Sequence, residues 1–122
     1  MEHIPEVDLA ISEIHRVLKK GGRAVITVPN KEKLRTDLCI HCHKVTPRSG
    51  HLWRFEKKEF AENLRSEGFK VIKSKEFGCL AHGYDPLAKL ESKLPFAIWN
   101  IWDIVLCKLV KPVYLMMVVI KE

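Results

Sequence analysis

The sequence predicts a small α/β fold of about three strands and three to four helices in one domain. Two observations predict it. Residues 5–20 carry apolar side chains at helical spacing, and a Gly-Gly pair separates them from the β-branched run RAVITVP. The segment FEKKEFAENLRSEGFKVI repeats this pattern of helix, glycine and strand at residues 55–72. Alternating units of this kind indicate helices packed on a sheet around one core.

The first predicted helix occupies residues 5–20. Pro5 suits its first turn, and Lys19 and Lys20 lie where the helix dipole favours cations. Gly21 and Gly22 are expected to end the helix, because glycine adopts the left-handed turn at low cost. The predicted apolar face comprises Val7, Ala10, Ile11, Ile14, Val17 and Leu18.

The elements that follow are predicted from short apolar patterns. The nearly continuous run at 23–29 predicts a strand covered on both faces, as in a parallel sheet. Residues 31–52 are polar and predict a long loop with a short helix. A second helix is predicted over 55–67 and ends at Gly68, with Phe60, Ala61 and Leu64 inward. The alternation after it predicts a half-exposed strand with Phe69, Val71 and Ile72 inward.

The tail from residue 94 is the most hydrophobic segment. Polar residues interrupt it before the roughly 20 apolar residues that a membrane span needs, so no transmembrane segment is predicted. Asn100, Asp103, Cys107 and Lys111 form one polar stripe at helical spacing on an otherwise apolar helix. We expect that helix to be core or a dimer face, although a lid or a peripheral membrane contact also suits it. Pro112 ends it before a final buried strand.

The overall charge is basic, with 21 Lys and Arg against 15 Asp and Glu, net +6. Such a surface could favour nucleic acid, acidic lipid or an anionic cofactor. Acidic residues interleave with most lysines and no run of five like charges occurs, so we expect a solvated surface without specific nucleic-acid binding. Four cysteines and no signal peptide favour a cytoplasmic protein.

The order of these features resembles class I S-adenosylmethionine-dependent methyltransferases of the type 11-like group. In that family a strand ends in Glu-His-Ile, the next helix ends in Arg-Val-Leu-Lys-x-Gly-Gly, and the following strand ends in Pro-Asn. The corresponding residues here are Glu2, His3 and Ile4, then 16–22, then Pro29 and Asn30.

The rest of the chain is similar to the same family. HLWRFEKKEFAENLRSEGFKVI resembles its His-x-x-x-Phe turn, helix and edge strand, and YLMMVVIKE resembles its last antiparallel strand. The resemblance implies a partial Rossmann-like methyltransferase fold, with one strand of the parallel type and two at the antiparallel edge. It also implies that Glu2 and His3 lie at the cofactor and substrate cleft, and that Pro29 and Asn30 bind substrate at the mouth of the next strand.

The sequence departs from the family at the cofactor site. The family holds S-adenosylmethionine with a Gly-rich turn and an acidic strand end, and no such turn is found here. The first four of the usual seven strands also have no counterpart. We therefore expect residues 1–122 to be a single partial domain, the C-terminal half only, from a truncated reading frame. The alternatives to truncation are a homo-oligomer or a separately encoded N-terminal half, either of which would cover the exposed strand edge.

A second set of candidate residues lies at 39–51. Cys39, Cys42, His43 and His51 are the residue types that tetrahedral zinc binds, although only the Cys-x-x-Cys pair has firm spacing. The alternative, which we prefer, is a metal-free polar loop. If the chain is a methyltransferase, His51 is also a candidate general base, because an imidazole can take up and release protons near neutral pH; alternatively, it caps the next helix.

Two functions remain. The first is the substrate-side half of a methyltransferase that acts on a small-molecule or lipid-like acceptor, in which orientation supplies most of the catalysis. The second is a non-catalytic remnant or accessory chain that binds a partner or itself. Because the Gly-rich turn is absent, we expect the isolated chain to be inactive and to bind no S-adenosylmethionine measurably.

Overall fold

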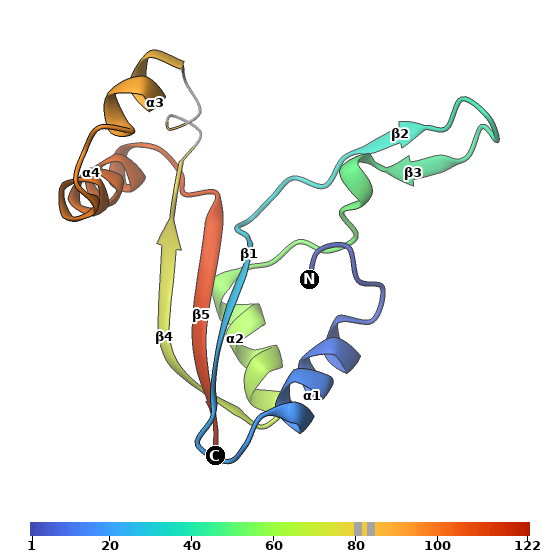
Figure 1. The fold of residues 1–122 in the computed structure, drawn as a ribbon. Helices are drawn as coiled ribbons and strands as arrows, with labels where there is room; N and C mark the ends of the chain where they lie inside the picture. Colours follow the sequence, from blue (N-terminus) through green and yellow to red (C-terminus); the bar gives the residue numbers. More distant parts are fainter. Residues whose placement is uncertain (80–81, 83–84) are drawn as a thin grey trace.

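The computed structural model describes residues 1–79, 82 and 85–122 and has an α/β fold. Its sheet has three strands in the order β1-β5-β4, with bounds Arg23–Pro29, Tyr114–Lys121 and Phe69–Phe77 respectively. The central strand β5 is antiparallel to both neighbours, so β1 and β4 run parallel to each other (Figure 1). The predicted α/β class, with β4 at the antiparallel edge, is confirmed.

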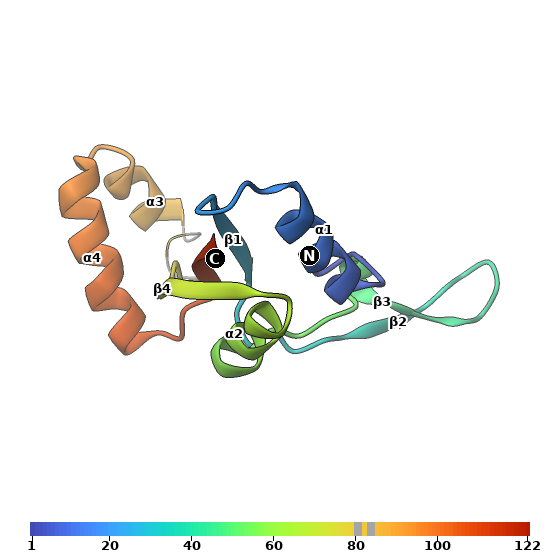
Figure 2. The same cartoon turned by 90° about the horizontal axis from the view of Figure 1, so that it is seen from below.

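Two helices cover one face of this sheet. α1 (Val7–Val17) and α2 (Lys57–Ser66) lie side by side there, whereas α3 (Asp85–Glu91) and α4 (Phe96–Leu109) lie beyond the end of β4 (Figures 1 and 2). Apolar side chains from α1, α2 and the covered sheet face make one core, and each large one contributes about 1.5–3 kcal/mol. The core comprises Val7, Ile11, Ile26, Val28, Phe55, Phe60, Ala61, Leu64, Phe69, Leu115, Met117 and Val119.

The first helix is shorter than predicted. It begins after Glu6, so Pro5 precedes it, and it ends at Val17, where the extended backbone of Leu18 breaks the helical path. The glycines therefore do not end the helix. Gly21, with φ of +75°, makes the turn into β1, where its N–H donates to the Lys121 carbonyl. Val17, the last residue of the helix, is exposed, although it was predicted on the apolar face.

β1 is covered on one face only, which corrects the prediction of two covered faces. Ile26 and Val28 are buried in the core, whereas Val25 is 64% exposed on the opposite face. That face carries no helix among the described residues. A run without alternation predicts a strand buried on both faces, but in this chain only every second side chain of β1 packs against the core.

Residues 31–52 form more than a loop. They contain a two-stranded hairpin, β2 (Thr36–Leu38) and β3 (Val45–Pro47), and the 3₁₀ turn η1 (Arg48–Gly50), which matches the predicted short helix. All six strand residues are exposed. The hairpin extends away from the sheet (Figure 1). Its apolar residues were too few to predict strands from the sequence.

The second helix and β4 follow the prediction closely. Phe60, Ala61 and Leu64 are buried, and Gly68, with φ of +86°, makes the turn into β4. Ile72 is the exception. A β-bulge between Val71 and Lys73 leaves it out of the pairing with β5, and its side chain is half exposed.

α4 faces the protein with its polar side, which is the reverse of the usual amphipathic helix. Its polar stripe faces the protein, and Asp103 is only 1% exposed. Its apolar residues face outward, with Phe96 and Leu109 each 79% exposed. The expectation that this helix is core is therefore wrong, and Lys111 lies beyond the helix end. No helix in the described part of the chain is long and apolar enough to cross a membrane.

Candidate functional site

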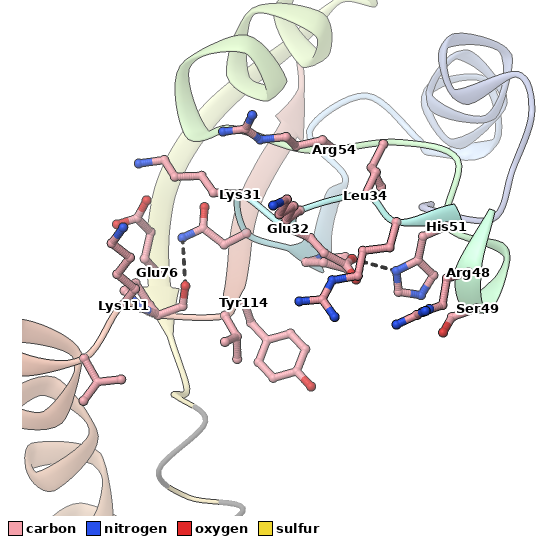
Figure 3. A pocket seen from close by; sticks show the side chains of 17 residues that line it. Lys31, Glu32, Leu34, Arg48, Ser49, His51, Arg54, Glu76, Lys111 and Tyr114 are labelled. Carbon is pink, nitrogen blue, oxygen red and sulfur yellow. Dashed lines mark hydrogen bonds and ion pairs between the residues drawn. The ribbon is translucent and has the colours of Figure 1, made fainter. Parts of the chain in front are cut away.

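A hollow lies at the carboxyl end of β1. It has a volume of about 920 Å³ and is bounded by the segment after β1, by η1 and by the connection from α4 to β5 (Figure 3). In open α/β sheets this is the end where ligands bind. Cationic lining residues outnumber acidic ones, with Glu32 and Glu76 as the two acids. The cations are Lys31, Lys33, Arg35, Arg48, Arg54 and Lys111.

Pro29 and Asn30, the predicted substrate residues, both line this cavity. Asn30 is buried because β1 ends there against the α4 to β5 connection: its N–H donates to the Val113 carbonyl, and its Nδ2 donates to the Pro112 carbonyl at 3.3 Å. Its Oδ1 has no hydrogen-bond partner in the described part of the chain. A buried acceptor without a donor costs about 1–3 kcal/mol, so a ligand donor at this atom would be favourable.

Glu2, His3 and His51 come together although 48 positions separate the last two. The Leu52 N–H donates to the Glu2 carbonyl at 2.7 Å and the Trp53 Nε1 donates to the Ile4 carbonyl at 2.7 Å, which ties the N-terminal segment to the turn after η1. The two imidazole rings meet edge to face with centroids 4.7 Å apart. The resemblance places Glu2 and His3 at the cleft. In the structure they lie beside His51, which lines the cavity, but neither of them is among the residues that line it.

The side chains around this group are oriented by specific bonds. The Nδ1 of His51 lies 2.6 Å from Glu32 Oε2, and the Nδ1 of His3 lies 3.1 Å from the Gly50 carbonyl oxygen. Gly50 has φ of +70°, a conformation that turns this carbonyl toward His3 and that a residue with a Cβ rarely adopts. The pKa of the Glu2 carboxyl lies below its usual value, first because its own backbone N–H donates to it and then because of the Met1 ammonium group.

Cys39, Cys42 and His43 lie at the hairpin tip, away from His51. The pKa of the Cys39 thiol is lowered by the backbone N–H groups of Cys42 and His41 and by the Cys42 side chain. The four residues considered for zinc do not converge. Among residues 1–79, 82 and 85–122, the group of three or more ligand atoms within reach of one another is Glu2, His3 and His51. The zinc prediction at 39–51 therefore gains no support.

A second polar cluster lies between α3, α4 and the end of β4. His82 bridges two buried carboxylates, with Nδ1 2.7 Å from Glu91 and Nε2 3.0 Å from Asp103. The Gly78 N–H also donates to Asp103 at 2.9 Å, and Trp102 Nε1 donates to Glu91 at 2.8 Å. Because both ring nitrogens face carboxylates, the imidazolium form donates to both.

The pKa values in this cluster follow from its geometry. Burial lowers the pKa of His82, but the hydrogen bonds to Glu91 and Asp103 and the charges of both carboxylates outweigh it, so the net change is upward. Burial, and then the hydrogen bond to Asp103, raise the pKa of the Cys107 thiol to about 11, so this thiol stays protonated at neutral pH.

Sequence reasoning missed Glu32 and His82. Glu32 lies three residues after Pro29, the last residue of β1, at the edge where site residues gather, and that position was the available signal. His82 carried no periodic signal of its own. The polar stripe on α4 was recognised, but nothing local showed which group it would face.

The chain is similar to known proteins in sequence and in fold. A family model described as Methyltransferase domain matches residues 1–74, more than half of the chain. No curated protein matches the chain. Among solved structures, the [4+2]-cyclase SpnF is similar in fold, with a TM-score of 0.55 and 20% sequence identity. The similarity covers 98% of this chain and 45% of SpnF, so the chain spans less than half the length of that protein.

Proposed function

The chain belongs to the methyltransferase-domain family, and on that premise we propose that it forms the acceptor-binding side of an S-adenosylmethionine-dependent methyltransferase. The observation that carries the proposal is the cavity at the carboxyl end of β1, with the unpaired Oδ1 of Asn30 beside it. This oxygen is itself buried, so an acceptor hydroxyl or amine reaches it once the Asn30 side chain turns toward the cavity, and donation to it would then remove the cost of leaving it unpaired.

The cavity wall indicates the class of acceptor. Its surplus of cations favours a molecule with an anionic group, because a concave site lined by one sign of charge concentrates the opposite charge. Val110, Pro112 and Val113 supply apolar surface on the side nearest α4. We therefore propose a small molecule or lipid-like acceptor that carries both an apolar part and a negative charge.

His51 is the proposed general base for that acceptor. Its Nδ1–H donates to Glu32, which fixes the tautomer and leaves Nε2 to accept a proton from the acceptor. Pro29 and Asn30 would orient the acceptor, and orientation alone supplies a large part of catalysis in two-substrate reactions.

We propose that the described residues do not complete a cofactor site, because the sequence carries no G-x-G-x-x-G turn of the kind that holds this cofactor. When bound, S-adenosylmethionine supplies an electrophilic methyl group, and we propose that elements outside these residues hold it. We expect calorimetric titration of the isolated chain with S-adenosylmethionine to give no binding heat. Micromolar binding would instead show that the chain is sufficient for the cofactor.

The acceptor proposal is tested by nuclear magnetic resonance with 4-hydroxybenzoate, phenyl phosphate and the neutral benzyl alcohol. We expect saturable shifts of the backbone amides of Lys31 and Tyr114, which line the cavity, with the two anions, and at least about tenfold weaker binding of the neutral probe. Asn30→Ala should abolish the response, whereas Asn63→Ala, on the exposed side of α2, should not. Shifts confined to other surfaces would contradict the acceptor role and favour an accessory chain.

A second proposal concerns the outward face of α4. From residue 86 to 113 the acids Glu91 and Asp103 are both buried, so the exposed charges there are the lysines 89, 93, 108 and 111. An apolar helix face with exposed aromatic residues and a cationic border favours an anionic lipid surface over water. We propose that α4 lies in the plane of such a surface, close to a cavity that accepts a lipid-like molecule.

Co-sedimentation with phosphatidylcholine vesicles, with and without phosphatidylglycerol, tests this second proposal. Binding should require phosphatidylglycerol and weaken as salt rises, because surface charges are screened. Salt-independent self-association in sedimentation analysis, without vesicle binding, would identify the face as a dimer contact instead.

A further inference from the structure

We propose that Glu2, His3 and His51 bind a divalent first-row transition-metal ion at the edge of the acceptor cavity. Each of the three offers one ligand atom, and these atoms all lie within 4.8 Å of one another. Metal–ligand bonds of about 2.0–2.2 Å place neighbouring ligand atoms roughly 3–3.5 Å apart, so modest side-chain rotation closes the group around an ion.

The hydrogen bonds around the two imidazoles support this assignment independently of the cluster itself. A histidine that binds a metal through one ring nitrogen usually donates the other N–H to a carboxylate or a backbone carbonyl. His51 has Glu32 at 2.6 Å from Nδ1, and His3 has the Gly50 carbonyl at 3.1 Å from Nδ1. Both rings are therefore held in the tautomer that presents Nε2 as a ligand.

The Glu2 carboxylate is placed to act as the third metal ligand, beside the two histidines. Glu2 Oε1 lies 3.8 Å from His3 Nε2, the atom that the Gly50 contact leaves available. The Glu2 side chain is about one fifth exposed and so is that of His51, which leaves the group half-buried and reachable by an ion. The Met1 ammonium group lies 3.3 Å from the other carboxylate oxygen and does not occupy Oε1.

The ligand set determines the class of ion. Two imidazoles and one carboxylate suit Mn²⁺, Fe²⁺ or Co²⁺, whereas Mg²⁺ and Ca²⁺ prefer oxygen ligands throughout. Three protein ligands leave coordination positions open, and His51 belongs both to the group and to the cavity wall. An acceptor hydroxyl bound at an open position would be more acidic. The metal ion would then activate the acceptor in place of His51 as the base.

The position of the group links this inference to the proposed function, but its test does not depend on methyl transfer. The full 122-residue chain, with any purification tag removed, is titrated with Co²⁺ in metal-free buffer and followed by visible absorption. We expect one Co²⁺ per chain. His3→Ala and His51→Ala should abolish the signal, and Glu32→Gln, which keeps all three ligands, should weaken binding about 10- to 100-fold.

Three matched controls separate this site from others. His41→Ala and the Cys39→Ser/Cys42→Ser double variant change the exposed hairpin tip and should bind Co²⁺ as the parent chain does, and excess Mg²⁺ should not compete. Circular dichroism confirms that each variant is folded. Unchanged Co²⁺ binding in His3→Ala and His51→Ala, or its loss in the cysteine variant alone, would overturn the proposal.

Discussion

α2 and α4 present opposite faces to the protein. α2 buries Phe60 and Leu64 against the sheet and exposes its charged residues. α4 buries Asp103 and exposes Phe96 and Leu109. The difference shows that periodicity identifies a helix and its two faces but not which face turns inward. For α4 the direction is set by His82 and the Gly78 N–H, which need acceptors in a buried position.

The largest expected effect comes from the conventional helix. Phe60→Ala removes a fully buried ring that packs edge to face on Phe55, with centroids 5.0 Å apart. We expect a loss of about 3–5 kcal/mol in the free energy of unfolding, measured by urea denaturation. Lys58→Ala, on the exposed side of the same helix, should change it by less than about 0.5 kcal/mol. A small effect of Phe60→Ala would mean that α2 is not part of the core.

Asp103→Ala tests the inverted helix in the same way. The change leaves the Gly78 N–H and one His82 nitrogen without acceptors in a buried site, which costs about 3 kcal/mol. Because the cluster lies outside the core, we expect the loss to appear as local opening of α3 and α4. Hydrogen exchange should accelerate there and stay slow in β5. Equal acceleration in both regions would show that the two helices and the sheet unfold as one unit.

A pH dependence should distinguish the two regions as well. The pKa of His82 is raised in the folded state, so its stabilising effect is fully present below its unfolded value and is lost as pH rises through the folded value. α4 should therefore open more readily in alkaline buffer, while α2 does not. Tryptophan fluorescence reports the change, since the His82 ring lies 5.2 Å from that of Trp99. His82→Gln should remove the dependence, and persistence in that variant would assign it to another group.

The smallest expected effect on stability is that of Leu109→Ser. The side chain is largely exposed and makes no core contact, so the free energy of unfolding should change by less than about 0.5 kcal/mol. Binding to vesicles that contain phosphatidylglycerol should nevertheless fall several-fold, because apolar area leaves the lipid contact. Lys58→Ser, on the far helix, is the matched control. Undiminished vesicle binding in Leu109→Ser would place the lipid contact elsewhere.

The sequence allowed the sheet and its covering helices to be predicted because each carries a local signal. α2 and its three buried residues were predicted correctly, and Pro29 and Asn30 line the cavity of about 920 Å³, while their predicted role in binding substrate stays a prediction. Exposure could not be predicted for Val25, because a β-branched run looks the same whether or not a second layer of helices covers it.

The candidate site was only partly predictable for a different reason. Glu2 and His3 were singled out by resemblance and His51 as a separate histidine, but their meeting depends on contacts over nearly fifty residues. The contact between His51 and Glu32 could not be predicted either. Glu32 lies in an irregular segment, where the distance along the sequence does not determine which way a side chain points. Contacts between distant segments of this kind carry no periodic pattern.

The central position of β5 has a consequence for how the chain folds. β1 and β4 touch only through this strand, which follows both of them in the sequence, and β1 pairs with residues about ninety positions away. Among the described residues, neither earlier strand has a sheet partner until β5 arrives. Loops of that length are slow to close, so assembly of the sheet should be the late and rate-limiting event of folding. Until then, α1 and α2 have no complete surface to pack on, and a nascent chain would present its apolar strands to chaperones and to other copies.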